Sequence, residues 1–133
     1  SFLFKPKYFL KKNQNLKLHF DSFHGFGNLD KAIELLYDDD KKDFKFFMEN
    51  QNYYNQGNMF ISKNKKIINN FYNTIFPWLQ RCESIFGFNE KSYGNTRLYA
   101  FLMERFISYW FNKYSKVKIW PIAFYDINKE NLV

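Results

Sequence analysis

The chain has 133 residues, enough for one domain that buries about two-thirds of its unfolded surface and too few for a second independent core. Aromatic residues make up 23% of the chain and charged residues 25%, a composition that excludes an intrinsically disordered protein. The net charge of +7 favours an anionic partner: nucleic acid, an acidic membrane surface or a phosphorylated small molecule.

Cysteine content and hydropathy indicate the kind of compartment in which the protein is expected and whether it crosses a membrane. The single cysteine, Cys82, excludes an internal disulfide and a cysteine-based zinc site, and its helical apolar context predicts a core residue. No apolar run approaches the ~20 residues that cross a bilayer, and no signal-peptide pattern opens the chain. We expect a soluble or peripheral protein in a reduced compartment. Because Ser1 and its neighbours already have the pattern of structured sequence, we also expect a piece of a longer chain.

The first third of the chain is predicted to be extended and then helical. Imperfect alternation in "FLFKPKYFL" and "LKLHF" predicts extended segments, with Pro6 confining the first to an edge or an irregular stretch. The stretch "HGFGNLDKAIELLY" predicts a glycine loop that holds His24, then a short helix with Asn28 as its N-cap. A second helix is predicted over residues 43–52.

An acidic run, Asp38 to Asp40, lies between these two predicted helices. It has the Asp-x-Asp spacing of metal-dependent sugar-nucleotide enzymes, but that motif needs an apolar strand to deliver both carboxylates to a cleft. Here the run follows a helix and precedes lysines. We therefore expect a solvated loop.

The rest of the chain is predicted to alternate helices and strands. A buried strand over residues 59–61 is followed by a long amphipathic helix from Lys65, which Pro77 must kink or divide. A further helix is predicted over residues 96–111, and "KVKIWPIAFYDI" has the alternation of a strand. This order predicts an α/β or α+β fold in one domain over residues 1–133.

The helix predicted over residues 96–111 carries a candidate polar site. At 100° per residue, Arg97, Glu104 and Ser108 share one narrow stripe, and nearly all of the remaining circumference is apolar. The stripe is either the one solvated face of the helix or the lining of a cleft, because charges on so apolar a helix are costly unless paired or facing a ligand.

Two further polar groups are weaker candidates. His19, Asp21 and His24 could bind a metal, but their spacing is not that of a complete site. His24 is the better candidate of the three for a functional contact. The amides of residues 55–58, with Gly57 allowing close backbone approach, could hold sugar hydroxyls or form a plain turn, and spacing alone does not separate these alternatives.

The order of features resembles a known family. The stretches that carry the likeness are "FHGFGNLDKAIELL", "YYNQGNMFISKNKKIINNFYNTIFPWLQRCES", "SYGNTRLYAFLMERFISYW" and "VKIWPIAFYDI". Within them the "NMFI" strand, the "FPWL" helix and the segment from Arg97 to Arg105 are the most specific. Together they resemble the C-terminal half of a bacterial glycosyltransferase family catalogued as domain of unknown function 4422, found in capsular and lipopolysaccharide loci, over residues 16–126.

The resemblance implies a GT-A-like α/β fold, which is a Rossmann-like nucleotide-diphospho-sugar transferase, here as a partial domain. Its members transfer a sugar from a nucleotide-sugar donor to a growing surface glycan. They also carry an N-terminal half with nucleotide-binding strands and a His-Tyr-Arg-Arg motif that nothing here matches. We therefore expect the piece to bind nucleotide poorly by itself.

The resemblance also implies site residues. The positions concerned are His24, Gly57, Asn58, Arg97, Glu104 and Arg105. Gly57 and Asn58 would contact the donor sugar. Glu104 would be the general base that deprotonates the acceptor hydroxyl or would orient Arg97, and Arg97 or Arg105 would neutralise the leaving diphosphate.

The implied partners are a nucleotide sugar and a glycan or lipid-linked acceptor, in the cytoplasm or at the inner face of the bacterial membrane. No cofactor is expected, and a divalent metal would have to bind without its usual motif. No phosphate loop, Gly-x-Ser-x-Gly elbow or His-Glu-x-x-His helix is present. The alternatives are a basic, aromatic-rich module that binds nucleic acid or glycan without catalysis, and a structural fragment without activity. Because most rings are expected on buried faces, nucleic acid is not the expected partner.

Overall fold

A computed structural model describes residues 1–8, 14–87, 97–123, 125–129 and 131–132. The helices of this part of the chain are α1 (Leu16–His24), α2 (Asn28–Glu34), α3 (Asp38–Asn50), α4 (Lys65–Phe86) and α6 (Leu98–Tyr114). The strands are β1 (Phe2–Phe4), β2 (Pro6–Tyr8), β3 (Tyr53–Asn55), β4 (Phe60–Ile61), β5 (Lys118–Trp120), β6 (Tyr125–Asp126) and β7 (Asn131–Leu132). The protein is a mixed α and β structure, and none of the described helices is long and apolar enough to cross a lipid bilayer.

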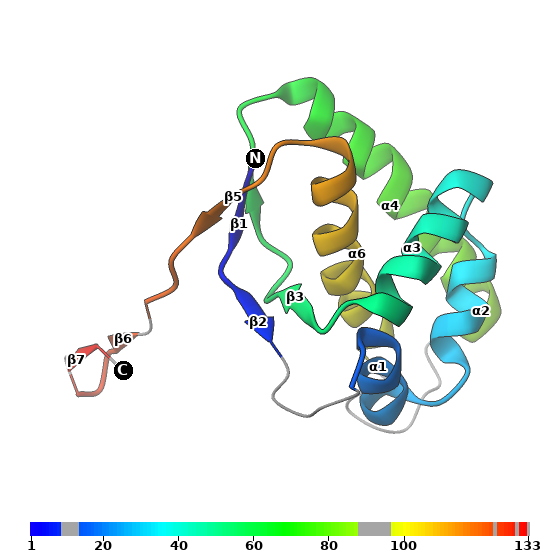
Figure 1. Cartoon of the computed structure of the whole chain (residues 1–133), viewed down its shortest axis with the longest axis horizontal. Coiled ribbons are helices and arrows are strands. Elements are labelled where there is room, and N and C mark those ends of the chain that lie inside the picture. The colour runs from blue at the N-terminus through cyan, green and yellow to red at the C-terminus, as the bar shows by residue number, and fades with distance from the viewer. Residues whose placement is uncertain (9–13, 88–96, 124, 130, 133) are drawn as a thin grey trace.

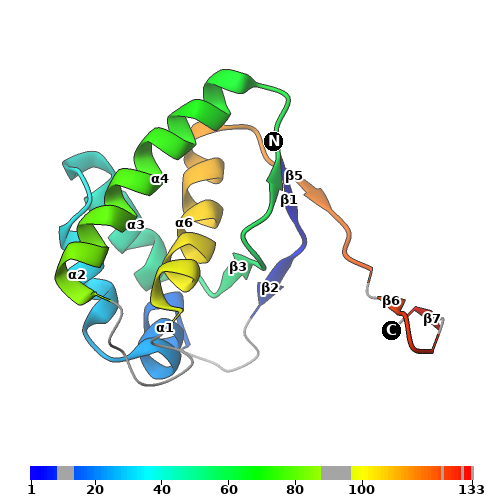
Figure 2. The same cartoon turned by 180° about the vertical axis from the view of Figure 1, so that it is seen from behind.

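Three small sheets hold the strands. In the largest, β1 lies in the middle, antiparallel to β4 and parallel to β5. The strands β2 and β3 pair antiparallel, as do β6 and β7. Figures 1 and 2 show the helices gathered on one side of the sheet β4-β1-β5, and the β6–β7 hairpin projecting away from them.

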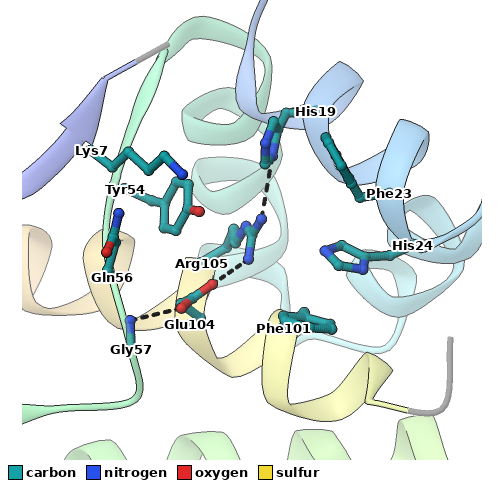
Figure 3. A pocket seen from close by; sticks show the side chains of 10 residues that line it. All are labelled: Lys7, His19, Phe23, His24, Tyr54, Gln56, Gly57, Phe101, Glu104 and Arg105. Atoms are coloured by element: carbon teal, nitrogen blue, oxygen red, sulfur yellow. Dashed lines mark hydrogen bonds and ion pairs between the residues drawn. The ribbon is translucent and has the colours of Figure 1, made fainter. Parts of the chain in front are cut away.

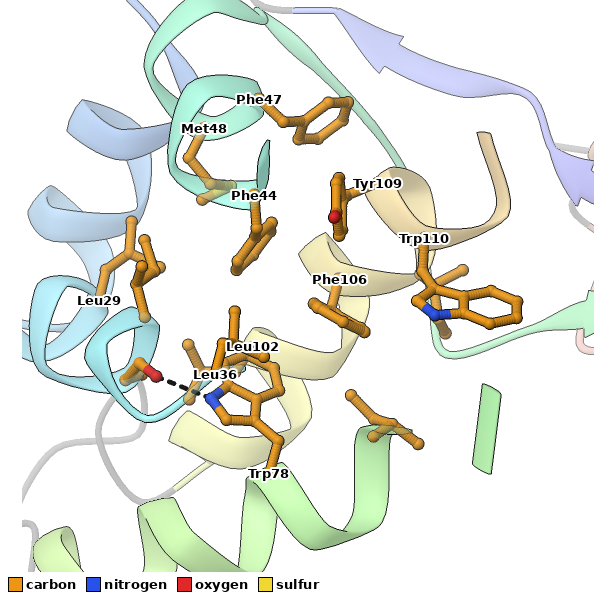
Figure 4. Close-up of a cluster of buried hydrophobic side chains, with 14 of the residues drawn as sticks. Leu29, Leu36, Phe44, Phe47, Met48, Trp78, Leu102, Phe106, Tyr109 and Trp110 are labelled. Atoms are coloured by element: carbon orange, nitrogen blue, oxygen red, sulfur yellow. Dashed lines mark hydrogen bonds between the residues drawn. The ribbon is translucent and has the colours of Figure 1, made fainter. Parts of the chain in front are cut away.

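The core forms around α6. Large aromatic side chains from α3, α4 and α6 interlock there, with Phe44 edge-on to both Trp78 and Phe106 at ring distances of 6.0 and 5.2 Å. The indole N–H of Trp78 donates to the Ala32 carbonyl over 2.7 Å, which ties α4 to α2 (Figure 4). Cys82 is fully buried in the same core, and burial raises the pKa of its thiol to about 12, so its prediction as a core residue is confirmed.

Local chemistry sets several helix starts. The side chain of Asn15 accepts from the Leu18 N–H and caps α1, and Asn64 caps α4 in the same way. Asp38, Asp39 and Asp40 form the first turn of α3, where carboxylates are favoured by the helix dipole. The prediction of a solvated loop there was wrong, because a run of Asp at this place starts a helix.

Other expectations also changed. The stretch "LKLHF" is helical, within α1, because its apolar residues Leu16 and Phe20 recur at i and i+4 and are buried. Asn28 is the first residue of α2, whose N-cap is Gly27. The predicted helix over residues 43–52 begins five residues earlier, and α4 runs through Pro77 as one helix. The expected start at residue 96 lies outside the described residues.

The strand expected at residues 59–61 is shorter and less buried than predicted. Only Phe60 and Ile61 form β4, Phe60 is half-buried, and Met59 and Ile61 are 51% and 57% exposed. The strand lies at the edge of its sheet, and only its Phe60 side chain packs against the core, on Phe71 and Phe111.

Candidate functional site

A cavity of about 530 Å³ lies where α1, β2, β3 and α6 meet, and we call it the polar pocket. It is lined by Lys7, His19, Phe23, His24, Tyr54, Gln56, Gly57, Phe101, Glu104 and Arg105. Figure 3 shows Lys7, Tyr54, Gln56 and Gly57 on one side, His19, Phe23, His24 and Phe101 on the other, and the Glu104–Arg105 pair between them. Segments far apart in the sequence thus contribute polar atoms to one cavity.

Glu104 is the anchored carboxylate of the polar pocket. One of its oxygens accepts from the Gly57 backbone N–H over 2.7 Å, and the other pairs with the Arg105 guanidinium at 2.5 Å. Gly57 has φ +76°, a conformation that favours glycine. Each carboxylate oxygen has a second acceptor direction, so both can still accept from a bound hydroxyl.

Arg105 is a buried cation at the bottom of the polar pocket. It is only 2% exposed, and its guanidinium lies 4.2 Å from the centre of the Tyr54 ring. Burial lowers the pKa of Arg105, although the Glu104 carboxylate opposes this shift. Its Nε–H is buried without a hydrogen-bond partner. A buried charge with a donor left unsatisfied is costly, and such groups gather at functional sites.

His19 is fixed in one tautomer by Arg105. A guanidinium nitrogen of Arg105 lies 3.3 Å from His19 Nδ1, and guanidinium can only donate. His19 Nδ1 therefore accepts, and the ring proton lies on Nε2. Burial, followed by the charges of Arg105, His24 and Lys7, lowers the pKa of His19 to about 4, so the ring is neutral at neutral pH.

His24 lies at the end of α1 and not in the loop expected from the sequence. It is 5% exposed and stacks on the Phe101 ring at 4.1 Å and 20°. The backbone carbonyl of His24 accepts from the Asn28 side chain, which joins α1 to α2. The imidazole is thus part of a packed wall of the polar pocket.

Residues 55–58, which we call the amide loop, are tied at their start to α6 and β1. The Asn55 N–H donates to the Ser108 hydroxyl over 2.8 Å, and the Asn55 side chain donates to the Phe4 carbonyl over 2.6 Å. Ser108 is fully buried, and the Glu104 side chain is only 16% exposed. The stripe on α6 therefore lines a cleft at Glu104 and makes a loop contact at Ser108, whereas Arg97 is exposed to solvent, so each alternative holds for part of the stripe.

Four of the six candidate residues line the polar pocket: His24, Gly57, Glu104 and Arg105. The other two do not. Asn58 is exposed, and its side chain donates to the Ala100 carbonyl over 3.2 Å. Arg97 occupies the N-cap position of α6, with its guanidinium 5.5 Å from the Phe101 ring centre. The carboxylate of Glu104 pairs with Arg105 and not with Arg97.

Four lining residues were not predicted: Lys7, Phe23, Tyr54 and Phe101. His19 was considered only for metal binding, and Gln56 only as part of the amide run. No short motif marks these positions, since they come together through the pairing of β2 with β3 and the contact of α1 with α6. The one available signal was the position of Tyr54 beside the amide run.

The described residues hold no group of three His, Cys, Asp or Glu side chains that could bind a metal. Asp21 is ion-paired with Lys17 at 2.8 Å, away from the lining of the polar pocket. Asp40 accepts hydrogen bonds from Tyr109 and Tyr114. These carboxylates do not form the ligand set of a divalent cation, and we assign no residue to a metal.

Comparison with known proteins gives one match. No curated protein and no solved structure matches the chain. Residues 3–116 match the domain of unknown function (DUF4422), a span that begins earlier and ends earlier than the expected 16–126. It includes α1, β2, β3, the amide loop and α6, and therefore every element that builds the polar pocket. The chain belongs to the DUF4422 family.

Proposed function

We propose that the chain is part of a GT-A-like glycosyltransferase that moves a sugar from a nucleotide-sugar donor to a bacterial surface glycan, with the polar pocket as the site of transfer. The observation that carries the proposal is the Gly57–Glu104–Arg105 arrangement. A carboxylate is held at the cavity wall by a backbone N–H and a buried guanidinium, and it keeps acceptor capacity for a ligand.

The composition of the lining fits a sugar. Glu104, Gln56 and the Gly57 loop offer acceptors and donors for hydroxyl groups, while Phe23 and Phe101 offer apolar ring surface. A few placed polar groups among apolar and aromatic walls are the usual composition of a small-molecule site. The volume of about 530 Å³ lies within the usual range for such sites of about 300–1,000 Å³.

In the proposed reaction the acceptor hydroxyl attacks the anomeric carbon of the donor sugar. The bond from that carbon to the diphosphate oxygen breaks, and the hydroxyl proton passes to Glu104 as general base. Arg105 supplies a fixed positive charge against the leaving diphosphate, and the exposed Lys7 supplies a second charge at the rim. No step is routed through a metal ion.

The remaining candidates take supporting roles in this proposal. Asn58 would hold the amide loop against α6 through Ala100, and not contact the sugar itself. His24 would form a flat wall with Phe101. Arg97, at the start of the same helix, would act on a ligand only at the outer edge of the site. The positive net charge would favour an anionic membrane surface or a phosphate-bearing acceptor.

The experiment is transfer by the full-length protein that contains this chain. We expect Glu104→Ala to abolish transfer of sugar from donor to glycan. Glu104→Gln keeps an oxygen for the Gly57 N–H but leaves Arg105 without its carboxylate, so we expect it to be less stable and to be inactive under conditions where it is folded. Glu83→Ala, which removes an exposed carboxylate on α4, is the matched control. Unaltered glycan synthesis by the Glu104 variants would remove Glu104 from the reaction.

A non-catalytic module that binds nucleic acid is the second candidate, and one observation favours it. Phe23 and Phe26 are 62% and 75% exposed, and bases stack on exposed rings. Phosphate contacts would make binding fall steeply with salt. A titration of single-stranded nucleic acid at rising salt tests this candidate, and binding that is absent or insensitive to salt would exclude it.

A further inference from the structure

A second cavity, of about 540 Å³, adjoins the polar pocket, and we call it the tryptophan cleft. The two cavities share Gln56 and Gly57, so the amide loop forms a common wall. The other walls of the tryptophan cleft are apolar, chiefly Phe4, Met59, Trp120 and Ile122. A ligand long enough to pass the amide loop would occupy both cavities.

Trp120 is the unusual side chain of the tryptophan cleft. The chain has three tryptophans, and Trp78 and Trp110 are 0% and 3% exposed, whereas Trp120 is 52% exposed. The indole is nevertheless held in place. Phe2 packs edge-on to it at 5.6 Å and 86°, and the Trp120 carbonyl accepts from the Lys5 N–H over 3.0 Å. Trp120 is thus an open aromatic surface packed on one side against Phe2.

The shape of the tryptophan cleft limits what can bind in it. Its walls at Trp120 and Met59 are both about half-exposed, at 52% and 51%, so an occupant would keep one side in water. An alkyl chain would leave apolar surface exposed there, and a phosphate would find no cation among the lining residues. A sugar ring has an apolar face of C–H groups for the indole and a rim of hydroxyls that can stay hydrated.

We propose that the tryptophan cleft is a subsite for a second sugar ring, one residue along the acceptor glycan from the reacting sugar in the polar pocket. Trp120 binds the apolar face of that ring. The Gln56 side-chain amide lies between the two cavities and hydrogen-bonds to the hydroxyls of adjacent rings. This assignment rests on the proposed function in one respect, which is that the bound glycan is the acceptor of the transfer reaction.

The test is direct binding of small glycosides, without donor and without transfer. The probes are methyl glycosides of glucose, galactose, mannose, rhamnose and N-acetylglucosamine, and the disaccharides built from them, titrated by calorimetry. We expect at least one disaccharide to bind more tightly than its monosaccharides. Trp120→Ala should lower the affinity for that disaccharide about tenfold or more, as truncation of a central aromatic side chain does, and should leave the affinity for monosaccharides unchanged.

Controls separate stacking from loss of structure. Trp120→Phe keeps an aromatic face and should retain most of the disaccharide affinity. Phe26→Ala removes a more exposed ring that lines neither cavity and should have no effect. Because Trp120 is the exposed tryptophan, disaccharide should also protect the wild-type fluorescence from quenching by acrylamide, and monosaccharide should not.

Three results would overturn the assignment. The first is equal affinity of the wild type and Trp120→Ala for every disaccharide, and the second is that the wild-type protein binds no glycoside. The third is that octyl glucoside binds more tightly than every disaccharide and loses this affinity in Trp120→Ala. Failure of transfer with intact, Trp120-dependent disaccharide binding would count against the proposed function alone. Transfer that proceeds with Trp120-independent binding would count against the subsite alone.

Discussion

The helix α6 carries two polar clusters, which differ in what satisfies their hydrogen bonds. At the middle of the helix, Glu104 and Arg105 line the polar pocket, and the Arg105 Nε–H has no partner. Near the C-terminal end, Asp40 accepts from Tyr109 at 2.6 Å and from Tyr114 at 2.9 Å. We call this second group, with Lys113 and Asp43, the helix clamp.

The helix clamp is satisfied by its own members. Lys113 lies 2.9 Å from Asp43 and 3.6 Å from Asp40. Burial, followed by the Asp40 carboxylate, raises the pKa of Tyr109, so its hydroxyl remains a donor at ordinary pH. None of these residues lines the polar pocket or the tryptophan cleft. The charges of α6 thus form two sets, one that lines a cavity and one whose members satisfy each other away from both cavities.

The largest expected difference between the two clusters is in stability. Arg105→Met leaves Glu104 without its guanidinium in a largely buried site, which we expect to cost about 3–5 kcal/mol of unfolding free energy. Lys113→Met is the matched change in the helix clamp, where Asp43 is half-exposed, and it should cost about 1 kcal/mol or less. Urea denaturation measures both, and equal losses would contradict the distinction.

A milder change in the helix clamp should affect stability but not function. Tyr109→Phe removes one hydrogen bond to a carboxylate, and we expect a loss of about 1.5 kcal/mol. Because the hydroxyl lies far from both cavity linings, sugar transfer by the full-length protein should stay at the wild-type rate under conditions where the variant is folded. If Tyr109→Phe is folded but does not transfer sugar, the helix clamp takes part in the reaction and the distinction is wrong.

The amide loop provides the next test. Gly57→Ala places a Cβ 2.7 Å from the mobile end of Met59 and forces alanine to φ +76°, with an expected cost of about 1 kcal/mol. Gly27→Ala has a similar backbone conformation and open space around its Cβ, and is the matched control. Glycoside binding measured by calorimetry should fall in the Gly57 variant and not in the Gly27 variant. Equal glycoside binding by the two variants would show that the amide loop does not contribute to the binding site.

The smallest expected effect is the pH dependence due to His19. Its folded-state pKa of about 4 lies below the ordinary value of 6.5, so the unfolded chain takes up a proton first as pH falls. The resulting stability loss should begin near pH 6.5, develop down to about pH 4, and be weaker in His19→Asn. Urea denaturation at several pH values measures it. Nitrogen NMR at neutral pH should show the proton on Nε2, and a ring protonated on Nδ1 at that pH would contradict the contact with Arg105.

Part of this structure could be predicted from local sequence. Helical periodicity located α4 and α6, and the narrow stripe on α6 marked Glu104 as a residue of either a solvated face or a cleft. The same rules failed at "LKLHF", where a helical i, i+4 pair was taken for strand alternation, and at Asp38, where acidic residues start a helix. At "LKLHF" two periods fit a short segment equally well, whereas the acidic run has no apolar period and only its place at a helix start explains its structure.

The rest of the candidate site depends on tertiary contacts that spacing does not encode. Lys7 reaches the polar pocket because β2 pairs with β3, and His19 because α1 packs near Arg105. Arg105 itself was assigned to the site through the family resemblance, since a helical wheel places it beside the predicted stripe and not on it. Its burial and its ion pair with the preceding residue became visible only in the fold.

The central claim is that the polar pocket, and not the helix clamp, binds the sugar nucleotide. The most direct measurement is an amide NMR titration of the full-length protein that contains this chain with UDP-glucose, UDP-galactose and UDP-N-acetylglucosamine. We predict that at least one of them shifts the Gly57 amide, which donates to Glu104, and leaves the Lys113 and Tyr114 amides unmoved. Shifts confined to the helix clamp, or no shift at Gly57 with any of the three, would contradict the account.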